Sequence, residues 1–266
     1  MIETKLKTRQ ISGVNWQGLK TLIEKEISRF IIVYTQTIVA PVVTTLMFYT
    51  VFALAFGGVA RSVGGTPYLL FLAPGLLMMS MVQNAFANTS SSLVISKVQG
   101  NIVDLLMPPL SAGELLTGFL LGGVLRGLVV GIAAGIVIAL FVPLSIYSIG
   151  AVIAYSILGT MMLSAMGIAA GIWSQKFDHI AAVTNFVITP LTFLSGTFYA
   201  MSTLPPFWQF LGHYNPFFYM IDGFRYGFIG HSEGDLAFGM GLLILINIML
   251  VSLCYLMLSS GYKIKS

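Results

Sequence analysis

Few residues in this sequence belong to a pattern that could catalyse a reaction. The three histidines, His179, His213 and His231, form no HExxH pair, and the single cysteine, Cys254, lies alone in an apolar run. No GxxxxGK[ST] loop occurs. Such patterns would hold a catalytic metal or the phosphates of a nucleotide. The sequence therefore predicts no catalytic residue, no metal ligand and no cofactor bound by this chain.

Arg126 is the residue whose position most needs a chemical explanation. It lies about twelve residues into the apolar run 115–141, and a charge near the middle of a bilayer is costly unless it faces water, a partner or a polar cavity. Arg126 is therefore a candidate for the path of a transported substrate, together with Asn84 and Asn88. The alternative is that its long side chain reaches the headgroups. Amides that could accompany it are Gln36, Asn84, Asn88, Asn185 and Asn247.

The segment 96–116, SKVQGNIVDLLMPPLSAGELL, predicts a short helix between two apolar runs. Gly100 should end the preceding helix, Asn101 can cap a new one, and that new helix should stop before Pro108. The apolar residues on one of its faces are Ile102, Leu105 and Leu106. An apolar face outside the bilayer needs a partner, which is either a separate protein or this chain's own N-terminal helix.

The start of the next apolar run carries a recognisable helix signal. Ser111 is followed three residues later by Glu114, which is the spacing of a capping box. We therefore expect a long helix to begin here.

A second unusual segment, 194–230, is too rich in proline for one membrane span and too aromatic for a solvent loop. Pro205, Pro206 and Pro216 should break helices, so we expect two short helices that dip into one leaflet without crossing it. Aromatic rings suit the headgroup level, either as a plain anchoring belt or as a functional hairpin. Asp222 and Arg225 are one helical turn apart and can pair.

The elements that must position these residues follow from composition. Of the 266 residues, 57% are hydrophobic and 8% are charged, whereas soluble domains carry about 25% charged residues. A bilayer is therefore the expected solvent, and nothing supports nucleic-acid binding. Runs of about 20 apolar residues can cross a bilayer as helices. An all-α, polytopic fold with six spans is predicted, at 31–57, 68–89, 115–141, 146–173, 180–200 and 236–260.

The distribution of Lys and Arg predicts the orientation. Ten lie on one side, in the N-terminal arm, in the second and fourth connections and at the C-terminus, against Arg61 and Arg225 on the other. Both termini are therefore expected in the cytoplasm and the hairpin 201–234 outside. Residues 1–30 are interpreted as a cytoplasmic arm with an interfacial amphipathic helix, and residues 31–266 as one domain. The apolar face of that helix is expected at Trp16, Leu19, Ile23, Ile27 and Phe30.

Small and helix-bending residues mark contacts within the spans. Glycines four residues apart, at 123, 127, 131 and 135, let another helix approach closely. Packing within one subunit is the first expectation, and a contact between two copies is the alternative. Pro41, Pro74 and Pro190 are expected to bend their spans.

Two sets of residues together resemble a known family. The first set follows the segment 96–114, at Gly100, Ile102, Asp104, Leu105, Leu106, Pro109, Leu110, Ser111 and Glu114. The second follows the aromatic segment, at Gly196, Leu204, Pro205, Asn215, Pro216, Tyr219 and Arg225. Both sets, in this order, are similar to signatures of the ABC type-2 transporter permeases of bacterial inner membranes. The family's acidic residue in the first signature is often Glu and is Asp104 here.

The resemblance implies a half-transporter of the cytoplasmic membrane. Two copies would form the pore among membrane lipids, and each would dock a cytoplasmic ATP-binding subunit through the coupling segment 96–114. ATP and Mg would be bound by those subunits. The substrate would move outward and is expected to be hydrophobic or amphipathic, first a drug-like compound and second a lipid or lipid-linked saccharide. The alternatives are a stand-alone secondary transporter or channel, and a membrane enzyme. Homodimer and heterodimer of permeases both stay open.

Overall fold

The computed structural model describes residues 13–56, 62–63 and 65–263, apart from the side chains of residues 105 and 106. This part of the chain is helical except for loops and two short paired strands, β1 (Ser62–Val63) and β2 (Thr66–Pro67). An all-α fold is thus confirmed. Some of the basic residues used to predict the orientation lie outside the described residues, namely Lys5, Lys7, Arg9, Arg61 and Lys265.

Five helices among the described residues are long and apolar enough to cross a membrane. They are the helix Thr35–Phe56, whose main part is α2 (Ala40–Phe56), then α3 (Tyr68–Val98), α5 (Ala112–Ala139), α6 (Ile149–Trp173) and α11 (Leu236–Ser260). The shorter helices are α1 (Trp16–Ile32), α4 (Ile102–Leu106), α7 (Phe177–Val183), α8 (Thr189–Phe193), α9 (Pro206–His213) and α10 (Pro216–Ile229).

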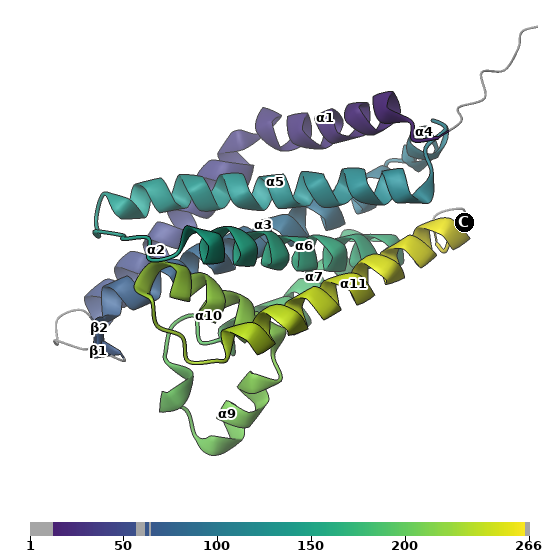
Figure 1. Ribbon diagram of the computed structural model, residues 1–266. Coiled ribbons are helices and arrows are strands. Elements are labelled where there is room, and N and C mark those ends of the chain that lie inside the picture. Colours follow the sequence, from purple (N-terminus) through teal and green to yellow (C-terminus); the bar gives the residue numbers. More distant parts are fainter. Residues whose placement is uncertain (1–12, 57–61, 64, 264–266) are drawn as a thin grey trace, which may run out of the picture.

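The five long helices form one bundle with α3 at its centre (Figure 1). The most apolar stretch of α3 is 83% buried within the chain, against 11% for the first span and 17% for α11. The first span and α11 therefore turn apolar surface outward, toward lipid or another subunit. Helix α4 and the described C-terminal end lie at one end of the bundle, and β1 and β2 lie at the other (Figure 1).

Polar caps and left-handed glycines set the ends of several helices. The side chains of Ser148 and Asp235 accept hydrogen bonds from the first turns of α6 and α11, which satisfies donors that have no partner within the helix. Gly230 and Gly261 follow α10 and α11 with φ of 70° and 69°, a conformation that glycine adopts without a steric penalty.

The predicted span 180–200 is a broken helix. It is helical from Phe177 to Phe193, through α7, a π-helical turn and α8, and it then leaves the helix at a turn where Gly196 has φ of 72°. It is not among the five helices that meet the length and apolarity of a span.

The same local structure precedes two of the three span prolines. A π-helical turn, Thr35–Val39, ends two residues before Pro41, and another, Thr184–Ile188, ends two residues before Pro190. A wider turn accommodates a proline, which lacks the N–H of a regular helix and crowds the preceding turn. Pro74 instead lies inside the continuous helix α3.

The predicted apolar face of α1 is rotated from the observed one. The buried residues are Leu19, Leu22, Glu26 and Phe30, while Trp16 is 73% exposed. Leu19 and Phe30 were predicted, but Leu22 and Glu26 were not, because a glutamate is not expected on a buried face. In the fold Glu26 faces Gly122 of α5.

The glycine ladder packs within the chain, in agreement with the first expectation. An added Cβ would meet Ser164 and Thr89 at Gly123, Thr160 and the Met81 carbonyl at Gly127, and the Met81 side chain at Gly131. The glycines therefore let α3 and α6 lie close against α5.

Candidate functional site

The segment between α3 and α5 forms the predicted short helix. Gly100 leaves α3 with φ of 75°, and α4 then spans Ile102–Leu106 and is followed by Pro108 and Pro109. Asn101 occupies the N-cap position, but its backbone carbonyl, not its side chain, accepts the hydrogen bond from Asp104 N at 3.1 Å. The loop is therefore closed by backbone contacts and by the two prolines.

Among the described side chains of α4 and the residue after it, the exposed apolar ones are Val103 and Met107. Val103 and Met107 are 57% and 75% exposed, and Asp104 is exposed beside them. Ile102 is half-buried against the chain's own core. The side chains of Leu105 and Leu106 lie outside the described residues. Val103 and Met107 were not predicted from the sequence, because they do not lie on the helix face that contains Ile102.

Glu114 joins this segment to the N-terminal helix. Glu114 N donates to Ser111 Oγ at 3.3 Å, and one carboxylate oxygen of Glu114 accepts from Ser111 N at 2.6 Å, and these two bonds form the predicted capping box. The other carboxylate oxygen accepts from the backbone N–H of Asn15, the N-cap of α1. Asn15 Nδ2 also donates to the Pro109 carbonyl at 3.3 Å. The start of α1 is therefore bonded to the exit of the coupling segment.

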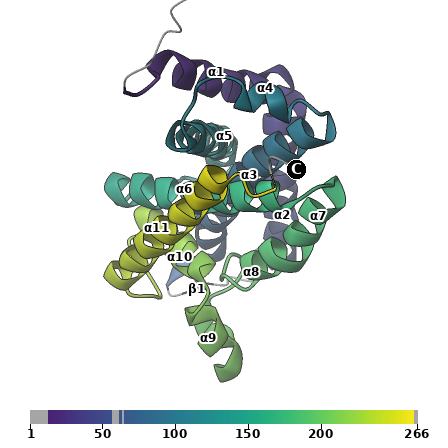
Figure 2. The same ribbon diagram turned by 90° about the vertical axis from the view of Figure 1, so that its right-hand side faces the viewer.

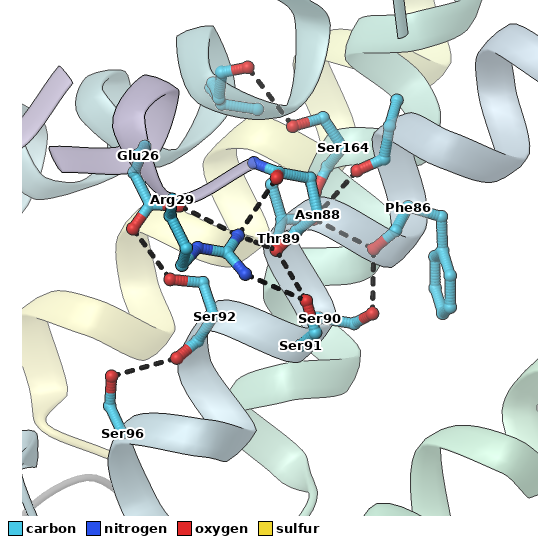
Figure 3. Close-up of polar contacts among 12 residues, drawn as sticks. Glu26, Arg29, Phe86, Asn88, Thr89, Ser90, Ser91, Ser92, Ser96 and Ser164 are labelled. Atoms are coloured by element: carbon cyan, nitrogen blue, oxygen red, sulfur yellow. Dashed lines mark hydrogen bonds and ion pairs between the residues drawn. The ribbon is translucent and has the colours of Figure 1, made fainter. Parts of the chain in front are cut away.

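The other end of α1 is bonded to α3 through a buried polar cluster (Figure 3). The Arg29 guanidinium donates to Asn88 Oδ1 at 2.9 Å, to the Asn88 carbonyl at 2.7 Å and to Ser91 Oγ at 3.2 Å, and it pairs with Glu26 at 3.1 Å. Ser92 Oγ donates to the second Glu26 oxygen at 2.7 Å. Glu26 has no exposed side-chain surface. Burial of a charge is costly unless it is paired and hydrogen-bonded, and this one is both.

Close packing supports these polar contacts. A Cβ added at Gly118 would collide with a Leu22 methyl, and one added at Gly122 would lie 2.7 Å from Glu26 Cβ. Helix α1 therefore rests on α5 along a stripe where only glycine fits. Together with the two polar attachments, this packing fixes α1 at both ends.

Lys97 makes a second attachment at this end of the bundle. Its ammonium donates to the carbonyls of Gly171, Ile172 and Ser174, at 3.1 Å for the first and the last. A cation at the C-terminus of a helix satisfies carbonyls that have no partner within the helix. The last turn of α3 is thereby held to the end of α6, directly before the coupling segment.

Arg126 lies inside the bundle, between α5 and α3. It is 8% exposed, and its guanidinium donates to Asn84 Oδ1 at 3.0 Å. Among the described residues its Nε has no partner. Of the amides proposed to accompany Arg126, Asn84 is the one bonded to it, whereas Asn88 is bonded to Arg29. Asn84 also lines a cavity between the first span and α3, with Arg126 bonded behind it.

The aromatic segment divides into an exposed part and a buried part. Helix α9 stands away from the bundle in both views (Figures 1 and 2), and Phe207, Phe210 and Tyr214 are 64%, 60% and 72% exposed. Helix α10 is instead packed among α6, α3 and α11. The expectation that its rings face lipid is wrong for Phe217 and Phe224, which are buried, because α10 closes the end of the core.

Arg225 and Asp222 do not form the expected ion pair. Arg225 is 2% exposed, donates to the Gly196 carbonyl at 2.6 Å and lies 3.7 Å from the centroid of the Phe71 ring. The Asp222 carboxylate accepts from the backbone N–H groups of Glu233 and Gly234 at 2.9–3.1 Å. Each side chain therefore ties α10 to a different loop.

The remaining residues of the hairpin signature are also structural contacts. Asn215 Oδ1 caps α10 through Phe217 N at 3.0 Å, and its Nδ2 donates to the Leu191 carbonyl at 2.7 Å. Pro216 is the first residue of α10, and Pro205 precedes α9. Leu204 packs against the cluster of Met201, Phe218 and Tyr219. Signature residues thus hold α10 against α8 and α3.

Residues 230–234 read Gly-His-Ser-Glu-Gly, which matches the GxSxG pattern of serine hydrolases. That pattern needs the serine on a sharp turn from a strand into a helix. Here Gly230 ends helix α10, and the loop that carries Ser232 leads to α11. Among the described residues, no group of His, Cys, Asp and Glu could hold a metal ion.

Comparison with known proteins places this geometry in a family. Residues 17–229 match the ABC-2 type transporter family. The chain is 39% identical, over 251 residues, to the inner membrane transport permease YadH of Escherichia coli K12, covering 94% of this chain and 98% of the relative. The YadH protein of Shigella flexneri gives the same figures. Nodulation protein J of Neorhizobium galegae is 24% identical over 190 residues, 71% of this chain and 72% of the relative.

The coupling segment, the residues Glu26 and Arg29 of α1 and the signature residues of α10 lie within the matched residues, whereas Asn15, Glu233 and Gly234 lie just outside them. The resemblance drawn from the two signatures is confirmed. The family also implies a separate ATP-binding partner subunit. The chain belongs to the ABC-2 type transporter family, as a membrane-spanning permease subunit.

Proposed function

We propose that this chain is one half of the pore of an ATP-driven exporter in a bacterial cytoplasmic membrane. A second copy would complete the pore, and two copies of an ATP-binding subunit would dock on the coupling segments. ATP and Mg would be bound in those partner subunits. The substrate would be hydrophobic or amphipathic and would move outward, with a lipid or lipid-linked saccharide as the alternative to a drug-like compound.

The observation that carries this proposal is the attachment of the coupling segment. Helix α4 projects Val103 and Met107 at one end of the bundle. The residues that follow it are bonded to the start of α1 through Glu114, and the end of α1 is bonded to α3 through Arg29. A displacement of α4 by a docked ATPase would therefore reach the central helix through hydrogen-bonded and packed contacts.

The proposed topology has six spans, with the helical segment Phe177–Phe193 as the fifth. Its exposed Phe186 and Val187, at 81% and 41%, suit a lipid environment. The hairpin 201–234 would lie outside, and both termini in the cytoplasm. The exposed rings of α9 would then meet the outer leaflet.

Co-purification tests the docking proposal. The tagged chain is extracted from its own host in a gentle detergent, and a stoichiometric ATPase with a Walker motif is sought by mass spectrometry. Burial of an apolar side chain contributes about 1.5–3 kcal/mol, and an aspartate there adds the cost of a desolvated charge. Val103→Asp and Leu105→Asp should therefore weaken retention of the ATPase about tenfold or more and abolish transport. Asp104→Asn should be milder.

Phe177→Asp is the matched control. Phe177 is 52% exposed, close to the exposure of Val103, but it lies outside the coupling segment. The control should keep its ATPase. Full retention by both coupling variants would show that α4 is not the docking element, and an ATPase-free but active protein would favour a secondary transporter or channel.

A further inference from the structure

The first span and α3 line an open cavity of about 290 Å³ whose polar lining needs an explanation. Its polar residues are Gln36, Thr44, Thr45, Ser80, Gln83 and Asn84. Both helices are long and apolar enough to cross a membrane. Polar groups at such a depth are expected to face water, a partner or a ligand.

The side-chain amides of Gln36 and Gln83 differ from two other polar groups of the lining, which have hydrogen-bond partners in the chain. Thr45 Oγ donates to the Pro41 carbonyl at 2.8 Å, and Asn84 is bonded both to Arg126 and to the Ser80 carbonyl. Within the part of the chain that the structure describes, the side-chain amides of Gln36 and Gln83 have no such partner. Gln36 is exposed and Gln83 is half-buried, so both amides can bind a polar group that enters the cavity. In an apolar medium an amide without a partner costs free energy, which favours such a group.

The chemistry of the lining selects an uncharged group. Amides and hydroxyls each donate and accept hydrogen bonds, so they complement other hydroxyls and amides. Anions are usually bound by lysine or arginine, and the lining has neither. Arg126 is bonded to Asn84 from behind and does not line the cavity.

A second cavity, of about 410 Å³, continues along the same span toward β1 and β2. Its lining includes the rings of Phe52, Phe56 and Phe198, together with the hydroxyl-bearing Ser202 and Thr203. Phe48 lies between the two cavities, since it lines the first and its ring centroid is 6.2 Å from that of Phe198, which lines the second. Residues 44, 48, 52 and 56 are four apart and therefore share one face of α2.

We propose that the polar cavity is a subsite for the uncharged, hydroxyl- or amide-bearing head group of an amphipathic substrate. The aromatic cavity is the next position on its path, where apolar ring faces can stack. This inference rests on the proposed function, because it names the cargo of the same pore.

Protection of a cysteine from labelling tests the subsite without ATP or a partner subunit. Ala40 lines the cavity, so Ala40→Cys in a Cys254→Ala background, in lipid nanodiscs, should react with N-ethylmaleimide. Octyl glucoside should slow the reaction, whereas octyl phosphate, octylammonium and glucose without a chain should not. Gln83→Leu should raise the half-protecting concentration of octyl glucoside about fivefold, as expected for the loss of about one neutral hydrogen bond.

Gln17→Leu, which alters an exposed amide on α1 outside both cavities, is the control and should leave protection unchanged. An unreactive Ala40→Cys variant, equal protection by all three octyl amphiphiles, protection by glucose alone or unchanged protection in Gln83→Leu would each overturn the inference. The assay needs no ATPase, so its failure is distinguishable from a failure of the docking test.

Discussion

Replacement of Arg29 by methionine should destabilise the protein strongly, because it removes the counter-charge of the fully buried Glu26 carboxylate. The variant keeps a long apolar side chain but loses the hydrogen bonds to Asn88, Ser91 and Glu26. The Glu26 carboxylate, which has no exposed surface, would keep the Ser92 hydroxyl as its donor. A buried carboxylate would thus remain without a counter-charge.

The size of the effect follows from the burial of Glu26, since the Arg29 side chain is itself 26% exposed. Loss of one partner of a buried ion pair costs about 3–5 kcal/mol. For a chain of this size, about 1 kcal/mol shifts the unfolding midpoint by roughly 2–4 °C, so Arg29→Met should lower it by roughly 6–20 °C. The pair Lys20–Glu24 on the same helix is the matched comparison, at 3.7 Å with side chains 77% and 61% exposed. Lys20→Met should cost about 0–1 kcal/mol.

The assay is thermal unfolding of the purified variants in detergent, followed by size-exclusion of the surviving fraction. The double variant Glu26→Gln/Arg29→Met should unfold at a midpoint much closer to that of the parent protein, because no unpaired charge remains in the core. Equal midpoints for Arg29→Met and Lys20→Met, or no recovery in the double variant, would refute the assignment of a buried pair that anchors α1.

Three further predictions test packing, orientation and the buried arginine. Gly122→Ala should destabilise by about 1–3 kcal/mol because its Cβ would lie 2.7 Å from Glu26 Cβ, whereas Gly241→Ala, with open space around it, should be neutral or stabilising in the same thermal assay. A cysteine at exposed His213, in a Cys254→Ala background, should react with an impermeant thiol reagent added outside intact spheroplasts, and labelling only after lysis would reverse the topology. Arg126→Met should assemble normally but lower substrate-stimulated ATPase activity of the complex, and full activity would show that Arg126 only supports the fold.

The parts of the fold that local patterns determine were predictable. The long helices follow from apolar runs, and the capping box of Ser111 and Glu114 follows from spacing alone. The break after Phe193 was missed, because an apolar run does not show where a helix will end in a turn such as that at Gly196.

The parts that depend on distant partners were not predictable from one sequence. Glu26 was overlooked because a glutamate on an amphipathic helix usually faces water, and its burial requires Gly122 on α5 and Ser92 on α3. The run of serines at 90–92 inside a membrane span was the available signal. The pairing of Asp222 with Arg225 was wrong because loops that fold back on α10 offer each side chain a closer partner.

The π-helical turn at Thr35–Val39 has a consequence for insertions and deletions. It contains more residues per turn than an α-helix, so one turn here takes up about one residue more than a regular helix would. Loss of a single residue within it can therefore restore a regular α-helix and leave the angular relation between α1 and α2 nearly unchanged. Loss of a residue from the regular helix between Glu26 and Ile32 has no such compensation. Since each residue turns an α-helix by about 100°, Leu22 and Glu26 would then turn away from Gly118 and Gly122. The π-helical turn is thus expected to tolerate a deletion that the neighbouring turns of α1 do not.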